Sequence, residues 1–263
     1  SPVPNLDIRI HKEAIGVCAM ITPWNFPLAM LAKKISAALA AGCTVVYKPS
    51  ELTPFAGIAL AKIAQEAGIP DGVLNVVSGD AAMIGSIFCS SPIVQKISFT
   101  GSTRVGRILL SQAAGQIKRC SMELGGNAPF IVFDDASIEK AIQGVLASKF
   151  RNCGKTCIAS NRFLIHRKIY PQFLDALKEL SKTLQIGDPF DCNTDIGPLA
   201  SLQAKEKLSS LLIDALDKGA TIEFGELPSG SDCFVSPIII SGLNSTMQAW
   251  KEELFGPAIA LCQ

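Results

Sequence analysis

The segment IGVCAMITPWNFPLAMLAKKISAALAAGCTVVYK, residues 15–48, decides the fold class of this chain. Its two ends, IGVCAMI (15–21) and TVVYK (44–48), are short apolar runs that are typical of buried strands. Between them, LAMLAKKISAALAAG (28–42) has the length and apolar spacing of a helix that stops at Gly42. A strand, a helix and a strand at this spacing form a right-handed βαβ unit, so the segment predicts a parallel sheet.

The same alternation continues along the chain. Further strands are expected at 72–79, 94–101 and 118–124, and further helices at 53–68, 81–89 and 102–115. After Gly125-Gly126 it restarts, with strands at 129–135, 161–167, 221–225, 236–241 and 257–262 and helices near 137–150, 171–184 and 200–218. We therefore expect an α/β protein, with a doubly wound Rossmann-like parallel sheet at 1–124 and a second α/β domain at 125–263.

The composition narrows the class of protein. Hydrophobic residues make up 48% of the 263 positions and charged residues 18%, which describes an ordered globular chain. A net charge of +1 offers no field for nucleic acid or an acidic membrane surface, and the most apolar run, residues 35–47, is too short to span a bilayer. Nine cysteines in a chain without a secretory signal pattern fit a reducing compartment such as the cytoplasm.

Two segments place polar residues at predicted strand ends in the first domain. FTGSTRVG (99–106) puts Gly101 and Ser102 at a strand-to-helix turn, where backbone N–H groups and the positive helix end bind phosphate. VYKPSE (46–51) ends a strand with Lys48 and Glu51, and a carboxylate there can hold ribose hydroxyls. An ordinary turn and a solvated surface pair are the alternative interpretations.

Two other segments carry candidates for acid–base and oxyanion chemistry. MELGGNAPF (122–130) sets Glu123 in an apolar surrounding, where burial raises a carboxyl pKa toward that of a general base. ITPWNFP (21–27) fixes Asn25 between prolines and aromatic residues, which suits an oxyanion donor. A turn between the domains and a structural turn cap explain these segments equally well.

The segment KFRNCGKTCIASNR (149–162) holds two cysteines, Cys153 and Cys157. A metal site is not expected, because the chain's two histidines, His11 and His166, lack ligand spacing around them. A nucleophile, a redox pair and apolar filling remain possible. The cationic side chains of Arg151 and Lys155 could increase the thiolate fraction of a nucleophilic cysteine.

Together, ITPWNFP, KPSE, FTGST, MELGG, GKTC and EELFGP occur in the order and spacing of the aldehyde dehydrogenase superfamily, and the chain most resembles its succinate-semialdehyde dehydrogenases. The resemblance implies that Cys157 is the nucleophile, that the Asn25 amide holds the oxyanion and that Glu123 is the general base. It further implies a dinucleotide site; the residues concerned are Trp24, Lys48, Glu51, Gly101, Ser102, Glu253 and Phe255.

The cofactor and the substrate follow from the same resemblance. Glu51 would repel a 2′-phosphate, so we predict NAD as the preferred cofactor, with NADP possible. Arg151 matches an arginine that grips a carboxylate-bearing aldehyde, and Lys33 stands where a second arginine is common. Because lysine lacks the bidentate fork, its grip is expected to be weaker. The predicted reaction is oxidation of succinate semialdehyde to succinate; glutarate semialdehyde and small neutral aldehydes are alternatives.

The resemblance also bears on the extent of the chain. The family pattern starts before residue 1 and continues past residue 263, so we expect a piece of a longer enzyme that lacks the strands through which its relatives form dimers or tetramers. A mitochondrial matrix location is the alternative to the cytoplasm in a eukaryote. Two rival functions remain: a catalytically silent nucleotide-binding module, and a thiol redox sensor that uses Cys153 and Cys157. Ala159, where some relatives have a cysteine, removes one possible disulfide partner of Cys157.

Overall fold

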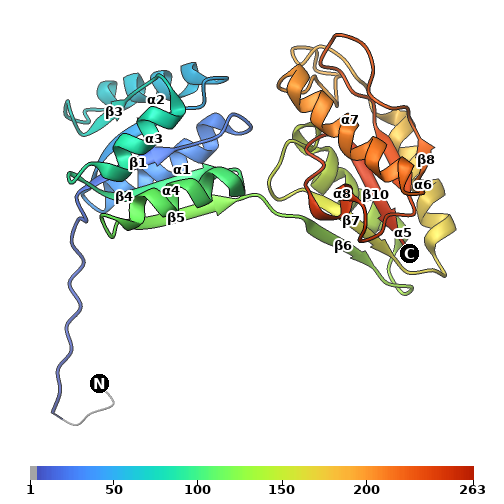
Figure 1. Ribbon diagram of the computed structural model, residues 1–263, viewed down its shortest axis with the longest axis horizontal. Coiled ribbons are helices and arrows are strands. Elements are labelled where there is room, and N and C mark those ends of the chain that lie inside the picture. The colour runs from blue at the N-terminus through green and yellow to red at the C-terminus, as the bar shows by residue number, and fades with distance from the viewer. Residues whose placement is uncertain (1–4) are drawn as a thin grey trace. The chain divides into compact units, whose positions relative to one another are not determined.

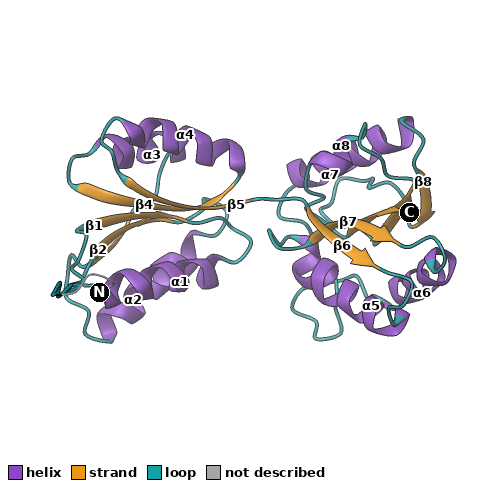
Figure 2. Ribbon diagram, turned by 90° about the horizontal axis from the view of Figure 1, so that it is seen from below, coloured by secondary structure: helices purple, strands orange, loops and turns teal. Residues whose placement is uncertain are grey.

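The computed structural model describes residues 5–263 and divides the chain into two compact units, one that ends at Leu124 and one that begins at Gly125 (Figure 1). Each unit is built on one five-stranded sheet with helices on both faces (Figure 2). The predicted α/β fold class, with a parallel sheet followed by a second α/β unit, is confirmed.

The first unit alternates strands and helices as far as its last strand. Its elements are β1 (Val17–Ile21), α1 (Pro27–Ala40), β2 (Thr44–Lys48), α2 (Pro54–Glu66), β3 (Leu74–Val76), α3 (Ala81–Ser90), β4 (Val94–Gly101), α4 (Thr103–Ala114) and β5 (Arg119–Leu124). The strand order is β3-β2-β1-β4-β5, and every pair is parallel. The chain winds outward from β1 in one direction and then returns to its other side at β4, so a topological switch point lies between β1 and β4.

Two apolar clusters hold the helices of this unit on opposite faces of the sheet (Figure 2). Proline at the first position starts α1, and the helix buries Leu31, Ile35 and Ala38, which recur at the spacing of one helical face. These residues pack on Cys18, Met20, Val45 and Tyr47 of β1 and β2. The opposite face of the sheet packs on α3 and α4 through Phe88, Cys89 and Leu109.

The second unit has a mixed sheet. Its elements are β6 (Ala128–Val132), α5 (Ile138–Val145), a π-helical turn (Leu146–Phe150), a 3₁₀ turn (Arg151–Gly154), β7 (Ser160–Ile165), α6 (Tyr170–Thr183), α7 (Leu202–Asp217), β8 (Thr221–Phe224), β9 (Ile238–Ser241), α8 (Gln248–Lys251) and β10 (Ala258–Cys262). The order is β6-β7-β10-β9-β8, with β8 antiparallel to β9 and the other pairs parallel. Helices α5 and α6 cover one face and α7 the other.

The second unit departs from the sequence expectation at two places. The helix expected over 137–150 changes to π-helical geometry at Leu146, and the left-handed residues Asn152 and Cys153 then end it. The short helix α8 was not anticipated, because four residues are too few for a periodic apolar pattern.

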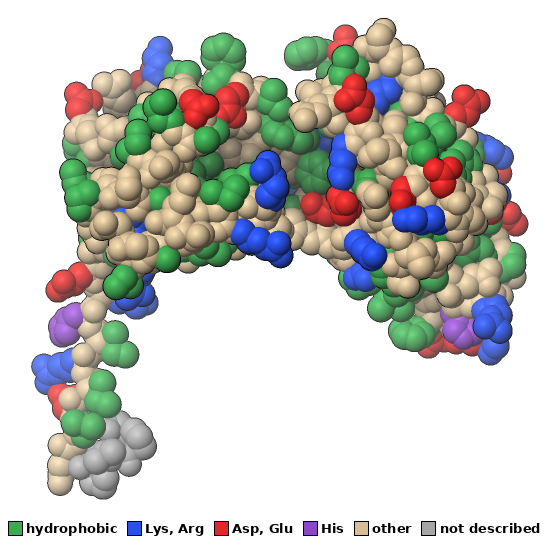
Figure 3. Space-filling model, viewed as in Figure 1, with side chains coloured by type: hydrophobic (Ala, Val, Ile, Leu, Met, Phe, Trp, Pro, Cys, Tyr) green, Lys and Arg blue, Asp and Glu red, His purple; other side chains and the backbone are tan. Residues whose placement is uncertain are grey.

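The surface carries no field of one sign on the face shown in Figure 3, where acidic and basic side chains are interspersed. Residues 5–14, which precede β1, are exposed and contain neither helix nor strand. Within residues 5–263, none of the helices combines the length and the apolar character that crossing a lipid bilayer requires.

Candidate active site

The carboxyl edge of the first sheet gathers the candidate residues of the first unit. Trp24 and Asn25 follow β1, Lys48 ends β2, Gly101 ends β4, and Glu123 is the penultimate residue of β5. Because β2, β1, β4 and β5 are neighbours and parallel, these ends lie along one edge, on both sides of the switch point. Open α/β sheets bind their ligands at this place.

The loop between β1 and α1 carries Trp24 and Asn25, which are both half-buried. Thr22 fixes the start of the loop, since it is buried and its Oγ1 shares a hydrogen bond of 2.7 Å with the hydroxyl of Tyr47 on β2. Pro27 sets the other end by starting α1. The Asn25 amide is therefore held between a strand and a helix start, as an oxyanion donor must be.

Lys48 and Glu51 form an ion pair, with Lys48 buried and Glu51 58% exposed. Partial desolvation acts to raise the pKa of Glu51, but the hydrogen bond and the charge of Lys48 outweigh it and the pKa is lowered. Glu51 therefore presents a charged carboxylate next to the sheet edge at neutral pH. A carboxylate in this position accepts hydrogen bonds from hydroxyl groups and repels phosphate.

The turn from β4 to α4 places Gly101 and Ser102 at the start of a helix. Ser102 caps α4, with its Oγ accepting the N–H of Val105 at 3.3 Å. A Cβ added at Gly101 would lie 2.5 Å from the Phe99 ring, so a larger residue at this position would require that ring to move. Among the described residues, the buried hydroxyl oxygens of Thr100 and Thr53 have no hydrogen-bond partner, and each adjoins this edge. Unpartnered buried hydroxyls beside a helix start are consistent with a polar ligand.

Glu123 corrects one expectation. Its side chain is exposed in the first unit, whereas the sequence predicted a buried carboxyl. The reason is topological, since β5 is an edge strand and borders only β4 on one side. The residue still lies beside Thr100 at the carboxyl edge.

The sequence reasoning missed Lys34, whose ammonium group interacts with the charge of Glu123. Lys34 lies on α1 and donates from Nζ to the Ser98 hydroxyl of β4 at 2.9 Å. Burial lowers its pKa to about 8, although the charge of Glu123 acts in the opposite direction. A signal was present in the sequence, because two adjacent residues of a helix point in different directions. Of the pair Lys33 and Lys34, one could therefore be expected to turn toward the sheet, and Lys34 is half-buried while Lys33 is exposed.

The amino edge of the second sheet gathers the other candidates. Cys157 precedes β7, Glu253 and Phe255 precede β10, and Gly125-Gly126 precede β6. Strands β6, β7 and β10 are neighbours and parallel, so these segments meet at one edge. Arg151 lies on the same loop as Cys157 and is exposed, while Cys157 is half-buried.

The Cys157 loop, defined as residues 151–157, has an unusual backbone. Asn152, Cys153 and Gly154 have φ values of 50°, 56° and 74°, so three consecutive residues occupy the left-handed region. Such conformations cost free energy and persist when the surroundings fix them. Lys155 donates from Nζ to Pro198 O at 2.7 Å, and Thr156 donates to Arg151 O at 3.4 Å.

The two cysteines of this region have different surroundings. Cys153 is buried in an apolar cluster, and its Sγ accepts the N–H of Gly197 at 3.2 Å. Cys157 is half-buried, and its neighbour Ile158 is 72% exposed. The geometry therefore suits Cys157 to reaction with a ligand and Cys153 to packing.

Glu253 is held against the start of β6. Its Oε1 accepts the N–H of Gly126 at 3.0 Å, and a Cβ added at Gly125 would lie 2.5 Å from its Oε2. Burial raises the pKa of Glu253, while the Gly126 N–H and the charge of Lys149 act to lower it. Phe255, two residues on, is half-buried.

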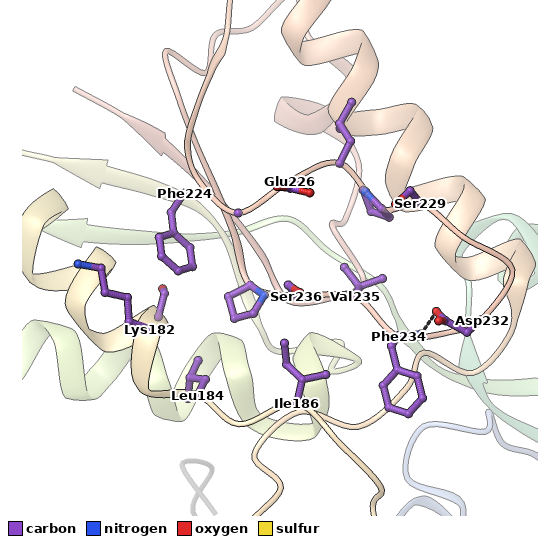
Figure 4. A pocket seen from close by; sticks show the side chains of 15 residues that line it. Lys182, Leu184, Ile186, Phe224, Glu226, Ser229, Asp232, Phe234, Val235 and Ser236 are labelled. Atoms are coloured by element: carbon purple, nitrogen blue, oxygen red, sulfur yellow. Dashed lines mark hydrogen bonds between the residues drawn. The ribbon is translucent and has the colours of Figure 1, made fainter.

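A separate pocket of about 520 Å³ lies between the end of α6 and the loop that joins β8 to β9 (Figure 4). Its lining includes Leu184, Ile186, Phe224, Glu226 and Phe234. None of the predicted site residues, all of which the structure describes, lines this pocket. Across residues 5–263 no group of three or more His, Cys, Asp or Glu side chains could hold a metal ion.

Comparison with known proteins gives a consistent result. A family model described as "Aldehyde dehydrogenase family" matches residues 2–263. The chain is 49% identical to a "Probable succinate-semialdehyde dehydrogenase [NADP(+)]" of Sinorhizobium fredii, over 98% of the chain and 53% of that protein. It is 50% identical to a mitochondrial succinate-semialdehyde dehydrogenase of Mus musculus, over 94% of the chain and 48% of that protein.

A solved structure agrees with these relatives. The crystal structure of succinate-semialdehyde dehydrogenase from Burkholderia pseudomallei superposes with a TM-score of 0.94 at 48% identity, over 96% of this chain and 52% of that one. The chain thus spans about half the length of the relatives it matches. The resemblance seen in the sequence motifs is confirmed, and the chain belongs to the aldehyde dehydrogenase family.

Proposed function

We propose that this chain supplies the nucleotide-binding and nucleophile-bearing parts of an enzyme that oxidises an aldehyde to a carboxylic acid with NAD(P). The observation that carries the proposal is the setting of Cys157. Its thiol is half-buried on a loop with three left-handed residues, at a sheet edge that also presents Glu253 and Phe255. The names of the relatives support the same reaction class.

The reaction begins at Cys157. Its thiolate attacks the aldehyde carbonyl and forms a thiohemiacetal, whose oxyanion accepts hydrogen bonds from the Asn25 amide and the Cys157 backbone N–H. A bound nicotinamide would supply the hydride acceptor that oxidation of the thiohemiacetal carbon requires. The resulting thioester is hydrolysed by a water molecule that Glu123 deprotonates, which releases the carboxylic acid and restores the thiolate.

Glu123 acts as a base in its charged form. Lys34 lies close enough for the charge of Glu123 to act on it, and that charge works to raise the pKa of Lys34 against the larger effect of burial. We therefore assign Lys34 a supporting role beside Glu123 that the sequence motifs did not indicate.

The dinucleotide is assigned to the carboxyl edge of the first sheet. Lys48 and Glu51 would hold the adenine ribose, Gly101 and Ser102 would hold the pyrophosphate, and Trp24 would line the crevice. In the second unit, Glu253 and Phe255 would hold the nicotinamide ribose. Because Glu51 carries a charged carboxylate, NAD is the expected preference, although the Sinorhizobium relative is named for NADP(+).

The substrate assigned to this site is a short aldehyde that bears a carboxylate, with succinate semialdehyde first. Arg151 is exposed on the Cys157 loop and can grip a carboxylate, and Lys33 adds a second positive charge from α1. Glutarate semialdehyde is the nearest alternative. The nine free cysteines favour a reducing compartment. We also expect the complete protein to form a homo-oligomer.

The test is NAD(P)H formation by the complete gene product against a panel of semialdehydes and neutral aldehydes. Cys157→Ala is expected to abolish turnover, while Cys192→Ala, which changes an exposed cysteine elsewhere in the same unit, leaves turnover unchanged. Arg151→Ala is expected to raise KM for succinate semialdehyde by about tenfold or more and to leave KM for a neutral aldehyde unchanged.

Two results would contradict this proposal. Turnover that survives Cys157→Ala would exclude Cys157 as the nucleophile. Binding of NAD without turnover of any aldehyde would favour the catalytically silent module.

A further inference from the structure

Two buried side chains form hydrogen bonds with the backbone N–H and the backbone C=O of Leu254. Lys149, on the π-helical turn, is fully buried and donates from Nζ to Leu254 O at 2.6 Å. Asn161 of β7, 2% exposed, accepts the Leu254 N–H on its Oδ1 at 3.0 Å. The same Oδ1 also accepts from Lys149 Nζ at 3.0 Å. Lys149, Asn161 and Leu254 thus form one closed hydrogen-bonded group, which we call the Lys149 clamp.

The clamp joins two segments that the proposed reaction uses. Leu254 stands between Glu253 and Phe255, so fixing its peptide fixes the segment that carries both. On the other side, the Asn161 side-chain amide donates to Ala159 O at 3.2 Å, two residues beyond Cys157. Lys149 itself lies two residues before the Cys157 loop.

A direct backbone contact connects the same two segments. A Cβ added at Gly154 would overlap the carbonyl oxygen of Gly256, and it would lie 3.1 Å from the carbonyl oxygen of Lys149. The Cys157 loop and the segment 253–256 are therefore packed together without space for a side chain. This contact fixes their separation, and the Lys149 clamp fixes the orientation of the Leu254 peptide.

A lysine at this place needs an explanation, because burial of an ammonium group is costly. An apolar side chain of similar volume would fill the space and avoid that cost. It would also leave Leu254 O with only the Gly256 N–H, at 2.8 Å, and Asn161 Oδ1 with only the Leu254 N–H. A buried oxygen that loses one of its hydrogen bonds is destabilised locally. What an apolar residue cannot supply is the donor that joins Leu254 O to Asn161 Oδ1.

We propose that Lys149 is a positioning residue that, through Leu254 and Asn161, holds Glu253 and Phe255 in register with the Cys157 loop. This inference rests on the proposed function, because it assigns the nicotinamide ribose to Glu253 and Phe255. It concerns a residue that does not contact the substrate and acts only through its neighbours.

The test compares Lys149→Met with Lys205→Met in the complete gene product. Lys205 is a matched control, because it is also a buried lysine of the second unit that donates to backbone carbonyls, those of Ser229 and Asp232. For Lys149→Met, which removes both hydrogen bonds of the Lys149 ammonium group, we expect KM for the dinucleotide to rise about tenfold. The KM for the aldehyde and the fraction of Cys157 that an alkylating agent modifies stay unchanged. Lys205→Met leaves all three quantities unchanged.

Hydrogen exchange supplies a readout that needs no catalysis. In Lys149→Met the amides of residues 252–256 are expected to exchange about tenfold faster than in wild type, and in Lys205→Met they exchange as in wild type. If Lys149→Met does not fold, Lys149→Gln replaces it, since its amide can still donate to Leu254 O and a smaller rise in both quantities is then expected.

The outcomes separate the two proposals. Unchanged KM for the dinucleotide together with unchanged exchange at 252–256 would overturn the role of Lys149 and leave the proposed function intact. Absence of any aldehyde-dependent NAD(P)H formation in wild type would overturn the proposed function, and hydrogen exchange would still decide whether Lys149 holds the segment.

Discussion

Cys153 and Cys157 are four positions apart and differ in what surrounds each sulfur atom. The Cys153 thiol lies in the apolar cluster with Phe150 and Phe163 and accepts a backbone N–H, whereas Cys157 lies at the margin of the unit. The sequence motif pointed to the second cysteine by resemblance alone. The structure adds a physical reason, because only Cys157 is half-exposed.

Glu51 provides a prediction about the cofactor. Replacement by Gln removes the charge that repels a 2′-phosphate and keeps the side-chain length. We expect kcat/KM with NADP to rise by about tenfold and kcat/KM with NAD to fall less, measured as initial rates with both cofactors. Glu66→Gln, which neutralises an exposed carboxylate on α2, is the control and changes neither rate. A Glu51→Gln enzyme with an unaltered NADP to NAD ratio would contradict the assignment.

Gly154 provides a prediction about stability. It has a φ of +74°, and a Cβ there would overlap the Gly256 carbonyl oxygen. Gly154→Ala is therefore expected to lower the free energy of unfolding by more than about 2 kcal/mol, measured by urea denaturation. Gly115→Ala is the control, since Gly115 has a right-handed backbone and open space around it. An equal decrease in the free energy of unfolding of the two variants would show that the backbone at Gly154 can accommodate a methyl group without destabilising the fold.

At the scale of elements, the β-strands and most helices could be predicted because their apolar periodicity is local. The helix that ends at Phe150 illustrates the limit. Residues 137–150 have a continuous helical pattern, yet the last turn is π-helical and presents Lys149 to the interior. That geometry depends on Leu254, which is 105 residues away in sequence, so no local pattern could reveal it.

The buried Lys149 predicts a pH dependence of stability. Burial lowers its pKa to about 7, and an unfolded lysine titrates near 10.4. Between these values the unfolded chain binds a proton that the folded chain has released, so this group's contribution to stability rises with pH and is lost as the pH falls through 7. The free energy of unfolding of wild type minus that of Lys149→Met should increase between about pH 7 and about pH 10. Urea titrations at several pH values measure it, and a difference that does not change with pH would contradict the prediction.

At the scale of the whole molecule, each unit has its own interior. The four clusters of buried apolar residues lie wholly within one unit or the other. The family motifs were enough to anticipate that Cys157 and Glu253 lie at one sheet edge. The sequence did not reveal which strands are neighbours there, since the order β6-β7-β10 joins strands that are distant in sequence. The exposure of Glu123 was missed for the same reason, because the sequence does not reveal that β5 is an edge strand.

The two tryptophans allow each interior to be monitored separately, because Trp24 lies in the first unit and Trp250 in the second. Leu211, fully buried on α7, is part of the second interior. In single-tryptophan variants, Leu211→Ala should lower the stability reported by Trp250 by about 2–5 kcal/mol and that reported by Trp24 by less. Fluorescence during urea denaturation provides both values. Equal shifts at the two probes would show that the units unfold as one.

The contact between Gly154 and Gly256 also bears on protein engineering. Because the Gly256 carbonyl group occupies the space that a side chain at Gly154 would need, the two stretches constitute a single transplantable module. A chimera that grafts residues 151–157 into a foreign scaffold without the segment 253–256 would remove the backbone contact that supports the left-handed conformation of the loop.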